Sequence, residues 1–562
     1  MSVENLSFTG LVCNNSWLQQ AKGASLQAQR LLRRKPTDQL IDEAYGESRL
    51  MKKSLSAFDL LAFGIGATIG SGIFALTGTA AAGQVSTSKD FISTPLINFI
   101  LGSPMGRDGA GPAIVISFLI AAVACGFAAL CYAELAAMIP VSGSAYTFAQ
   151  AALGELIAWI IGWDLILEYA VGNVAIAVSW SDYFLHLFHG MTGMQLPLWL
   201  TTDTGTALTR IKDLALDSPQ RQFYSSLTLP DVFGHPLAIN VPAFFIVAVV
   251  TWVLVVGIKE SAWVNTAAVA IKVIIVLFFI IYGAFFVHPE NWVPFAPHGL
   301  SGIMGGAAIV FFSFIGFDAI SSTAEETKNP QRDMPIGMIG SLLICTLLYA
   351  AVSLVLTGIL PYQKYADDAA PVATALQVAG NPWAHLIVSV GALAGMTSVL
   401  LVFQLGQPRI FMAMARDGLL PPFFSKLHPK FRTPYIPTIL TGVIVGVSCL
   451  CIDIGQAAEL TNIGTLAAFI IVCAGVTKLR KSEPDRVRPF RCPMVPLIPI
   501  LGIISCFILM LSLPLITWLR FFVWMGVGVA IYFCYGYKHG HEEIPYVPKE
   551  IPPDDETNIP MP

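Results

Sequence analysis

Charged residues are scarce in this chain of 562 residues, because Asp, Glu, Lys and Arg together make up only 12% of it. A soluble domain carries about 25% charged residues, so the chain lacks the polar side chains that a water-exposed surface requires. Its net charge is only −4, far from the strongly basic balance that is typical of nucleic-acid binding. No nucleic-acid partner is therefore expected.

Motifs of catalysis and of ATP coupling are also missing from the sequence. There is no GxxxxGK[ST] phosphate loop, so ATP is not expected to drive the activity. The His, Cys and Asp residues do not have the spacing of a metal site, and no nucleophile motif is found. We expect neither a metal nor a cofactor, and we do not expect an enzyme.

Disulfides and a signal peptide are not indicated either. The ten cysteines avoid the expected outer loops and are interpreted as packing residues. Residues 1–57 lack the pattern of a basic start, an apolar run and a cleavage site. We interpret them as a basic cytoplasmic arm.

Long apolar runs are abundant, with 55% hydrophobic residues and a mean hydropathy of +0.68. A membrane-spanning helix needs about 20 apolar residues. On this criterion we predict twelve spans: 58–82, 112–138, 155–187, 240–258, 263–287, 303–323, 336–360, 383–406, 434–452, 459–477, 495–514 and 517–537.

Most Lys and Arg residues fall in the segments on one side of these spans, the side of the amino terminus. The positive-inside rule then predicts a multi-pass protein of the cell membrane with both termini in the cytoplasm. The segments 83–111 and 188–239 become long outer loops. Residues 538–562 are predicted to be a disordered cytoplasmic tail.

Lys272 is a charge inside an otherwise apolar run. A lysine near the middle of a spanning helix costs about 2.5–3.5 kcal/mol on insertion scales, and such charges mark ion or proton pathways by default. The alternative is a structural tether, in which Lys272 binds a carbonyl group of the first span.

Glycines interrupt the first and sixth spans. The first contains Gly64, Gly66, Gly70 and Gly72 around the helix, which favours an unwound stretch over a one-sided packing motif of the GxxxG type. The sixth, 303–323, contains a serine, a glycine and an acidic residue in its apolar run. Each span opens a five-helix set of opposite orientation, and paired interruptions of this kind point to a transporter binding site.

An unwound helix offers backbone N–H groups to a carboxylate and C=O groups to an ammonium. Both kinds of group in one pocket fit the zwitterion of an α-amino acid. The sequence therefore predicts an L-amino acid as the substrate.

At these residues the chain resembles the cationic amino acid transporter family of the amino acid–polyamine–organocation superfamily, in its twelve-span prokaryotic form. Four stretches carry the resemblance: Gly64–Phe74, Tyr132–Tyr146, Gly316–Asp333 and Gln407–Lys430. It implies an all-α integral membrane fold of the LeuT type, with 5+5 inverted repeats over 58–287 and 303–477, and two further helices over 495–537.

The resemblance also implies roles for individual residues. The substrate would meet Thr68, Ser71 and Gly72 of the first span, and Phe312, Ser313 and Ile315 of the sixth, with Met396 setting side-chain size. Lys272 would occupy the place of a sodium ion in sodium-coupled relatives. Glu168 would lie near the binding region, either for proton coupling and cationic substrates or as a helix-to-helix hydrogen bond. Phe314 stands where a tyrosine is common in the family.

These expectations converge on a monomeric secondary transporter in the lipid bilayer, driven by a proton gradient. Cationic amino acids (arginine, lysine, ornithine) and small neutral ones are both retained as substrates. An obligate amino-acid or amino-acid/polyamine exchanger on the same fold, without proton coupling, is the first alternative. A transport-inactive amino-acid sensor is the second.

Overall fold

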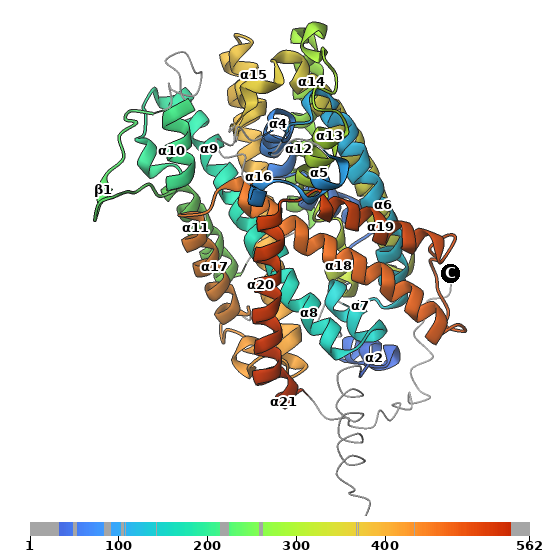
Figure 1. Cartoon of the computed structure of the whole chain (residues 1–562). Coiled ribbons are helices and arrows are strands. Elements are labelled where there is room, and N and C mark those ends of the chain that lie inside the picture. Colours follow the sequence, from blue (N-terminus) through green and yellow to red (C-terminus); the bar gives the residue numbers. More distant parts are fainter. Residues whose placement is uncertain are drawn as a thin grey trace, which may run out of the picture.

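The computed structural model describes residues 33–48, 53–83, 91–102, 106, 108–141, 143–213, 224–257, 262–366, 368, 370–431 and 433–540. Most of the predicted amino-terminal arm and tail, and parts of both outer loops, lie outside these residues. Helix α2 (Thr37–Ser48) marks one end of the bundle and α15 (Pro371–Val378) marks the other (Figure 1). We refer to them as the α2 end and the α15 end.

The first half of the chain forms most of its helices from long apolar runs. Their bounds are α3 (Ala57–Thr68), α4 (Thr77–Ala82), α5 (Leu96–Leu101), α6 (Ile114–Met138), α7 (Ser144–Ala152), α8 (Glu155–Ile166), α9 (Gly172–Thr192), α10 (Thr204–Asp213), α11 (Val241–Val256) and α12 (Ala262–Gly283). A two-stranded hairpin, β1 (Asp231–Val232) and β2 (His235–Pro236), stands before α11.

The second half continues in the same way. Besides α15, it contains α13 (Gly299–Val310), α14 (Pro330–Ile359), α16 (Pro382–Arg416), α17 (Tyr435–Cys449), α18 (Ile454–Ser482), α19 (Leu497–Leu511), α20 (Leu515–Ile531) and α21 (Tyr537–His539). Lys538, where the predicted tail begins, is still part of the last helix.

Within the described residues, eight helical segments are long and apolar enough to cross a membrane, and the bent pair α3–α4 makes a ninth. Helices α11, α17 and α19 are apolar but shorter. They coincide with three of the predicted spans. The part of the chain that the structure describes is therefore all-α apart from the small hairpin, with the apolar helices of a membrane protein.

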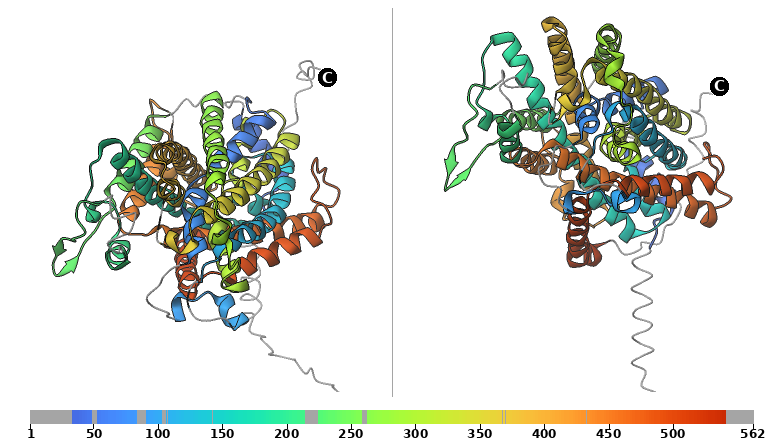
Figure 2. Two further views of the ribbon diagram at one scale, coloured as in Figure 1. Left: turned by 90° about the horizontal axis from the view of Figure 1, so that it is seen from above. Right: turned by 45° about the horizontal axis from the view of Figure 1, so that its top comes forward.

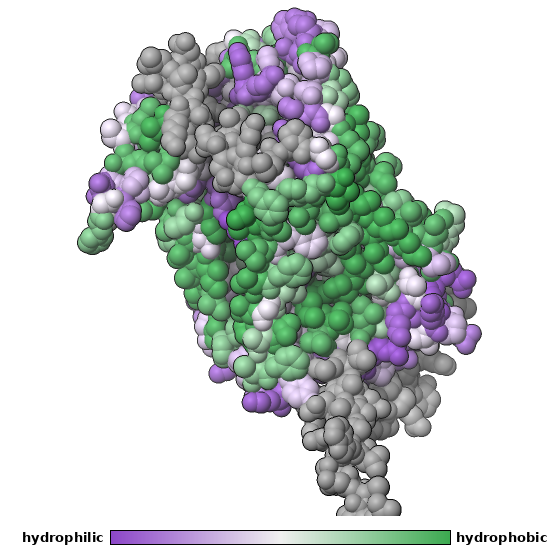
Figure 3. Space-filling view, viewed as in Figure 1, coloured by the Kyte–Doolittle hydropathy of each residue, from purple (hydrophilic) through white to green (hydrophobic). Residues whose placement is uncertain are grey.

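Large apolar side chains cover the flanks of the bundle, as Figure 3 shows in green on the visible face. Trp252 is 67% exposed, Leu347 66% and Ile274 63%. A soluble protein rarely exposes apolar surface on this scale, whereas lipid tails cover it without cost. The polar residues gather near the two ends of the bundle (Figure 3).

Glycines bring α14 close to α3 at the centre of the bundle. A Cβ atom on Gly337 would lie 2.9 Å from the Cβ of Leu60, and one on Gly64 would lie 2.6 Å from the Ser341 hydroxyl. Small residues at such crossings let two backbones approach, which is how helices pack in lipid. Helix α14 also packs along α6, while α16 packs along α9.

The 188–239 loop contains a small core of its own, formed around Leu198, Ala207 and Tyr224. This loop, with the hairpin that it contains, projects sideways from the bundle, as both views in Figure 2 show. Arg210 anchors it, since its guanidinium donates 2.7 Å to the Asp182 carboxylate of α9 and 2.6 Å to the Tyr224 hydroxyl. Both Arg210 and Asp182 are buried.

Replacing Arg210 with Gln should destabilise the protein by about 3 kcal/mol, because Asp182 would keep a buried charge without its partner. Thermal unfolding in detergent would measure this loss. The double variant Asp182→Asn/Arg210→Gln should recover part of the stability. The matched control is Lys364→Gln, which replaces an exposed cation at the same end. An equal loss of stability in Arg210→Gln and Lys364→Gln would contradict the anchoring role.

Candidate functional site

The first span is interrupted directly after α3. Ile69 is extended (φ −75°, ψ 96°), Ser71 follows, and the chain resumes as a π-helical turn over Gly72–Leu76 before α4. The two halves are bent by 40°. The Thr68 hydroxyl donates back to the Gly64 carbonyl, one turn earlier in α3, at 2.7 Å.

The sixth span is interrupted in the same manner. Helix α13 ends at Val310, a 3₁₀ turn covers Phe311–Phe314, and Ile315 is extended (φ −63°, ψ 132°). Gly316 follows with φ +121°, and a Cβ atom there would lie 2.8 Å from the Ala67 carbonyl oxygen. Glycine is thus required both by the backbone conformation and by the approach of α3.

The two interruptions face each other. A Cβ atom on Gly72 would collide with Ser313, so the absence of a side chain allows the contact. Tyr349 of α14 joins the two breaks, because its hydroxyl lies 2.9 Å from the Thr68 carbonyl and 2.9 Å from the Ser313 carbonyl. A hydroxyl carries one proton, so it can fully satisfy only one of these two acceptors.

Two hydroxyls at the breaks also lack partners. Ser71 is fully buried and Ser313 is 1% exposed, and among the described residues neither side-chain oxygen has a hydrogen-bond partner. Buried polar groups are normally hydrogen-bonded, and exceptions call for an explanation such as a ligand site.

Lys272 of α12 reaches the first break from the side. Its ammonium donates to the Gly66 carbonyl at 2.6 Å and to the Ile69 carbonyl at 3.3 Å, and the residue is 1% exposed. The aliphatic chain packs 3.4 Å from the position that a Cβ on Gly395 of α16 would take. We expected this contact between Lys272 and the first span. It is compatible with both interpretations of Lys272, as a structural tether and as part of a proton pathway.

Glu168 lies in a π-helical turn, Leu167–Val171, that separates α8 from α9. Such turns inside helices are frequent at functional sites. Its carboxyl group is buried close to that of Asp318, which follows the second break, but among the described residues neither Glu168 oxygen has a hydrogen-bond partner. Asp318 in turn accepts from the Gly316 N–H at 3.1 Å.

Helix α18 supports the second break. The Asn462 amide donates to the Ala308 carbonyl at 2.7 Å and to the Ile309 carbonyl at 3.2 Å. These carbonyls belong to the last turn of α13, where intrahelical donors run out. Asn462, from a distant segment of the chain, therefore supplies hydrogen bonds that the end of α13 lacks at the second break.

The structure brings most of the predicted residues together. Thr68, Ser71 and Gly72 lie at the first break, and Phe312, Ser313 and Ile315 lie at the second, which meets the first where Gly72 approaches Ser313. Met396 is fully buried in α16, next to the glycine that packs on Lys272. We did not predict Tyr349 or Asn462. Asp318 was visible as an acid in an apolar run, but nothing local indicated its pairing with Glu168.

The α2 end of the bundle is closed by a polar cluster around Asp417, at the end of α16. Its carboxylate accepts from the Tyr146 hydroxyl of α7 at 2.6 Å and from Gln150 at 3.3 Å, and it pairs with Lys35 at 3.1 Å. Segments that are far apart in the chain thus meet below the site. Among the described residues, no group of three or more His, Cys, Asp or Glu could hold a metal ion.

Two interrupted helices inside an apolar bundle, with a buried lysine from a third helix bonded to one of them, are typical of a membrane transporter. The comparison with known proteins agrees. The chain belongs to the amino acid permease family, whose model matches residues 55–532. The family resemblance read from the sequence is thereby confirmed.

Several individual relatives with named substrates are similar to the chain. The chain is 45% identical to the branched-chain amino acid permease BcaP of Bacillus subtilis and 42% identical to a methylthioribose transporter of the same organism, each match covering 91% of this chain and 98% of the relative. It is 38% identical to the vacuolar cationic amino acid transporter 4 of Arabidopsis thaliana, over 81% of this chain and 68% of the relative. All three are transporters, which confirms that the chain is not an enzyme.

Replacing Gly72 with Ala should lower the uptake of a labelled amino acid into proteoliposomes by about tenfold or more, because the added methyl group overpacks the contact with Ser313. Gly126→Ala in α6 is the matched control, since a Cβ atom there has nothing within 4 Å. Equal uptake by the two variants would show that the approach of the breaks is not needed for transport.

Proposed function

We propose that the protein is a proton-coupled importer of L-amino acids that works by alternating access around the two breaks. The observation that carries the proposal is the pairing of these breaks, each with a buried serine hydroxyl that has no hydrogen-bond partner among the described residues. The proposal includes twelve spans in a LeuT-type 5+5 arrangement, a monomer in the cell membrane, and both termini in the cytoplasm. The α2 end would then face the cytoplasm.

In this proposal the substrate carboxylate binds at Ser71 and Gly72, where the second half of the first span begins. The first N–H groups of a helix have no acceptor within the helix, and the helix dipole favours an anion there. The unpartnered Ser71 hydroxyl adds a further donor.

The substrate ammonium binds carbonyl groups at the ends of the two breaks. Because the single proton of Tyr349 serves the carbonyls of both Thr68 and Ser313, one of these acceptors is available to an ammonium. The carbonyls of Phe312 and Ile315 complete the set inferred from the family resemblance. All of these residues are buried, so binding requires an opening of the bundle.

The side chain of the substrate would meet apolar residues. Phe312, Ile315 and Met396 are all apolar and at most 5% exposed, which favours a branched-chain or other neutral amino acid. The similarity to a branched-chain amino acid permease supports this choice. The carboxyl pair Glu168–Asp318 is the specific observation in favour of the second candidate, a cationic amino acid.

Proton coupling would involve Lys272 and Glu168, with the proton gradient as the only driving force and no cofactor. The Lys272 ammonium holds the first half-helix through the Gly66 and Ile69 carbonyls. Loss of its proton weakens this attraction and frees α3 to move. Glu168 and Asp318 repel each other when both are ionised, so a proton on either carboxyl group would relieve the repulsion.

Access from the α2 end would require the Asp417 cluster to separate. Lys35, Tyr146 and Gln150 converge on this carboxylate from the amino-terminal segment and α7. The substrate would therefore enter from the opposite side first and leave once these contacts break, as rocking of one bundle against another requires.

Replacing Lys272 with Ala should abolish accumulation of labelled leucine in proteoliposomes under an imposed pH gradient. Exchange of internal for external leucine should persist at a reduced rate, because the substrate groups on the two breaks remain. Accumulation at the wild-type level would reject the coupling role. Pure exchange by the wild-type protein, insensitive to pH, would instead favour the exchanger.

Replacing Glu168 with Gln should distinguish the two substrate classes. If a cationic side chain binds at this carboxyl pair, uptake of arginine should fall at least about tenfold more than uptake of leucine, as a lost charge partner predicts. Competition by unlabelled arginine, leucine, lysine and methylthioribose would measure the preference. Equal losses for arginine and leucine would assign Glu168 a structural or proton-carrying role.

A further inference from the structure

An open groove of about 590 Å³ lies between the first turns of α14 and the loop that joins α18 to α19. Its walls are apolar and come from Pro335, Ile336, Ile339 and Phe490. Gln331 and Arg332 line its polar rim. The groove is separate from the two breaks and from the Asp417 cluster, because it shares no residue with either.

The rim of the groove is positively charged. Arg332 is exposed and forms no ion pair with the residues that the structure describes. Two more exposed cations stand close in the chain, Lys328 before α14 and Arg491 directly after Phe490. The neighbouring acid Asp333 is buried and does not line the groove.

The apolar wall continues along the outside of α14. Ile336 is 43% exposed, Leu343 61% and Leu347 66%, and their spacing of seven and four residues places them on one face of the helix. A hydrocarbon chain that starts in the groove therefore finds a continuous apolar path toward the α15 end.

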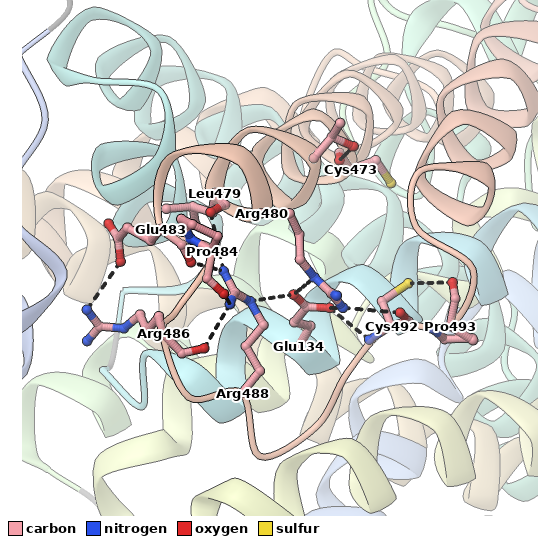
Figure 4. A network of polar contacts seen from close by, with 11 residues as sticks. Glu134, Cys473, Leu479, Arg480, Glu483, Pro484, Arg486, Arg488, Cys492 and Pro493 are labelled. Atoms are coloured by element: carbon pink, nitrogen blue, oxygen red, sulfur yellow. Dashed lines mark hydrogen bonds and ion pairs between the residues drawn. The ribbon is translucent and has the colours of Figure 1, made fainter.

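The opposite wall is fixed by a network of ion pairs and hydrogen bonds (Figure 4). Glu134 of α6 accepts from Arg480 at 2.8 and 2.7 Å and from the Cys492 N–H at 2.8 Å. Arg488 lies 3.2 Å from the same carboxylate and donates to backbone carbonyls of the loop, including those of Glu483 and Arg486. The residues Pro489 and Phe490 are thus held between two anchored positions.

We propose that this groove binds one anionic glycerophospholipid, with the headgroup phosphate at Arg332 and an acyl chain over Ile336, Ile339 and Phe490. The unpaired cation and the apolar wall match the two halves of such a lipid, and basic residues at the membrane surface attract anionic lipids. The orientation of the site toward the cytoplasmic leaflet rests on the proposed function, whereas the binding itself does not.

The test uses the purified full chain in detergent and native mass spectrometry to titrate phosphatidylglycerol and phosphatidylcholine with identical acyl chains. The wild type should bind phosphatidylglycerol more tightly. Arg332→Glu should weaken that binding at least about fivefold, as expected for reversing one charge at a lipid phosphate. Lys364→Glu, an exposed cation at the α15 end, should bind as the wild type does.

A second variant, Ile339→Trp, fills the groove without changing charge and should weaken the binding of both lipids. Inorganic phosphate should not displace phosphatidylglycerol, because it has no acyl chain. Equal binding of the two lipids by the wild type, unchanged binding by Arg332→Glu and Ile339→Trp, or displacement by phosphate would overturn the proposal. None of these readouts depends on transport, so they are separate from the tests of the proposed function.

Discussion

A peptide group buried away from water needs a hydrogen-bond partner, and the rest of this structure depends on that constraint. Within lipid, a helix meets it for every residue except those at its ends. This chain creates four such ends inside the bundle by interrupting α3–α4 and α13. Four polar side chains nearby bond to backbone groups at these ends: Lys272 and Tyr349 reach the first break, while Tyr349, Asn462 and Asp318 reach the second.

The same contacts couple the site to the surrounding helices. Because Tyr349 spans both breaks, a shift of either one relative to α14 changes the hydrogen bonding of the other. Lys272 adds a link from α12 to α3 whose strength depends on one proton. A substrate that takes over the acceptors at the breaks therefore competes with Tyr349, and this competition is a physical means of linking occupancy to helix movement. The tight glycine contacts between α3 and α14 would transmit that movement along the bundle.

Much of this site was predictable from local sequence, and the part that was not depends on distant residues. The glycine clusters predicted both interruptions, since glycine destabilises a helix wherever it stands, and the isolated lysine predicted a buried contact. Tyr349 gave no signal, because a tyrosine in an apolar helix is ordinary and its partners Thr68 and Ser313 are 281 and 36 residues away. Asn462 and the Glu168–Asp318 pair were missed for the same reason. The family resemblance supplied the remaining site residues, which spacing alone could not assign.

The proposed recognition by backbone groups would also fit the range of substrates that the relatives' names give. Carbonyl and N–H groups at a break are present whatever the side chains are, so substitutions around Phe312, Ile315 and Met396 can change the substrate without dismantling the site. The relatives include a branched-chain amino acid permease, a cationic amino acid transporter and a methylthioribose transporter. Methylthioribose has neither an ammonium nor a carboxylate, yet its hydroxyls can both donate and accept hydrogen bonds. In the proposed site, peptide groups at the breaks and the hydroxyls of Ser71 and Ser313 would serve either chemistry, so selectivity would come from the apolar residues and the buried charges that surround them.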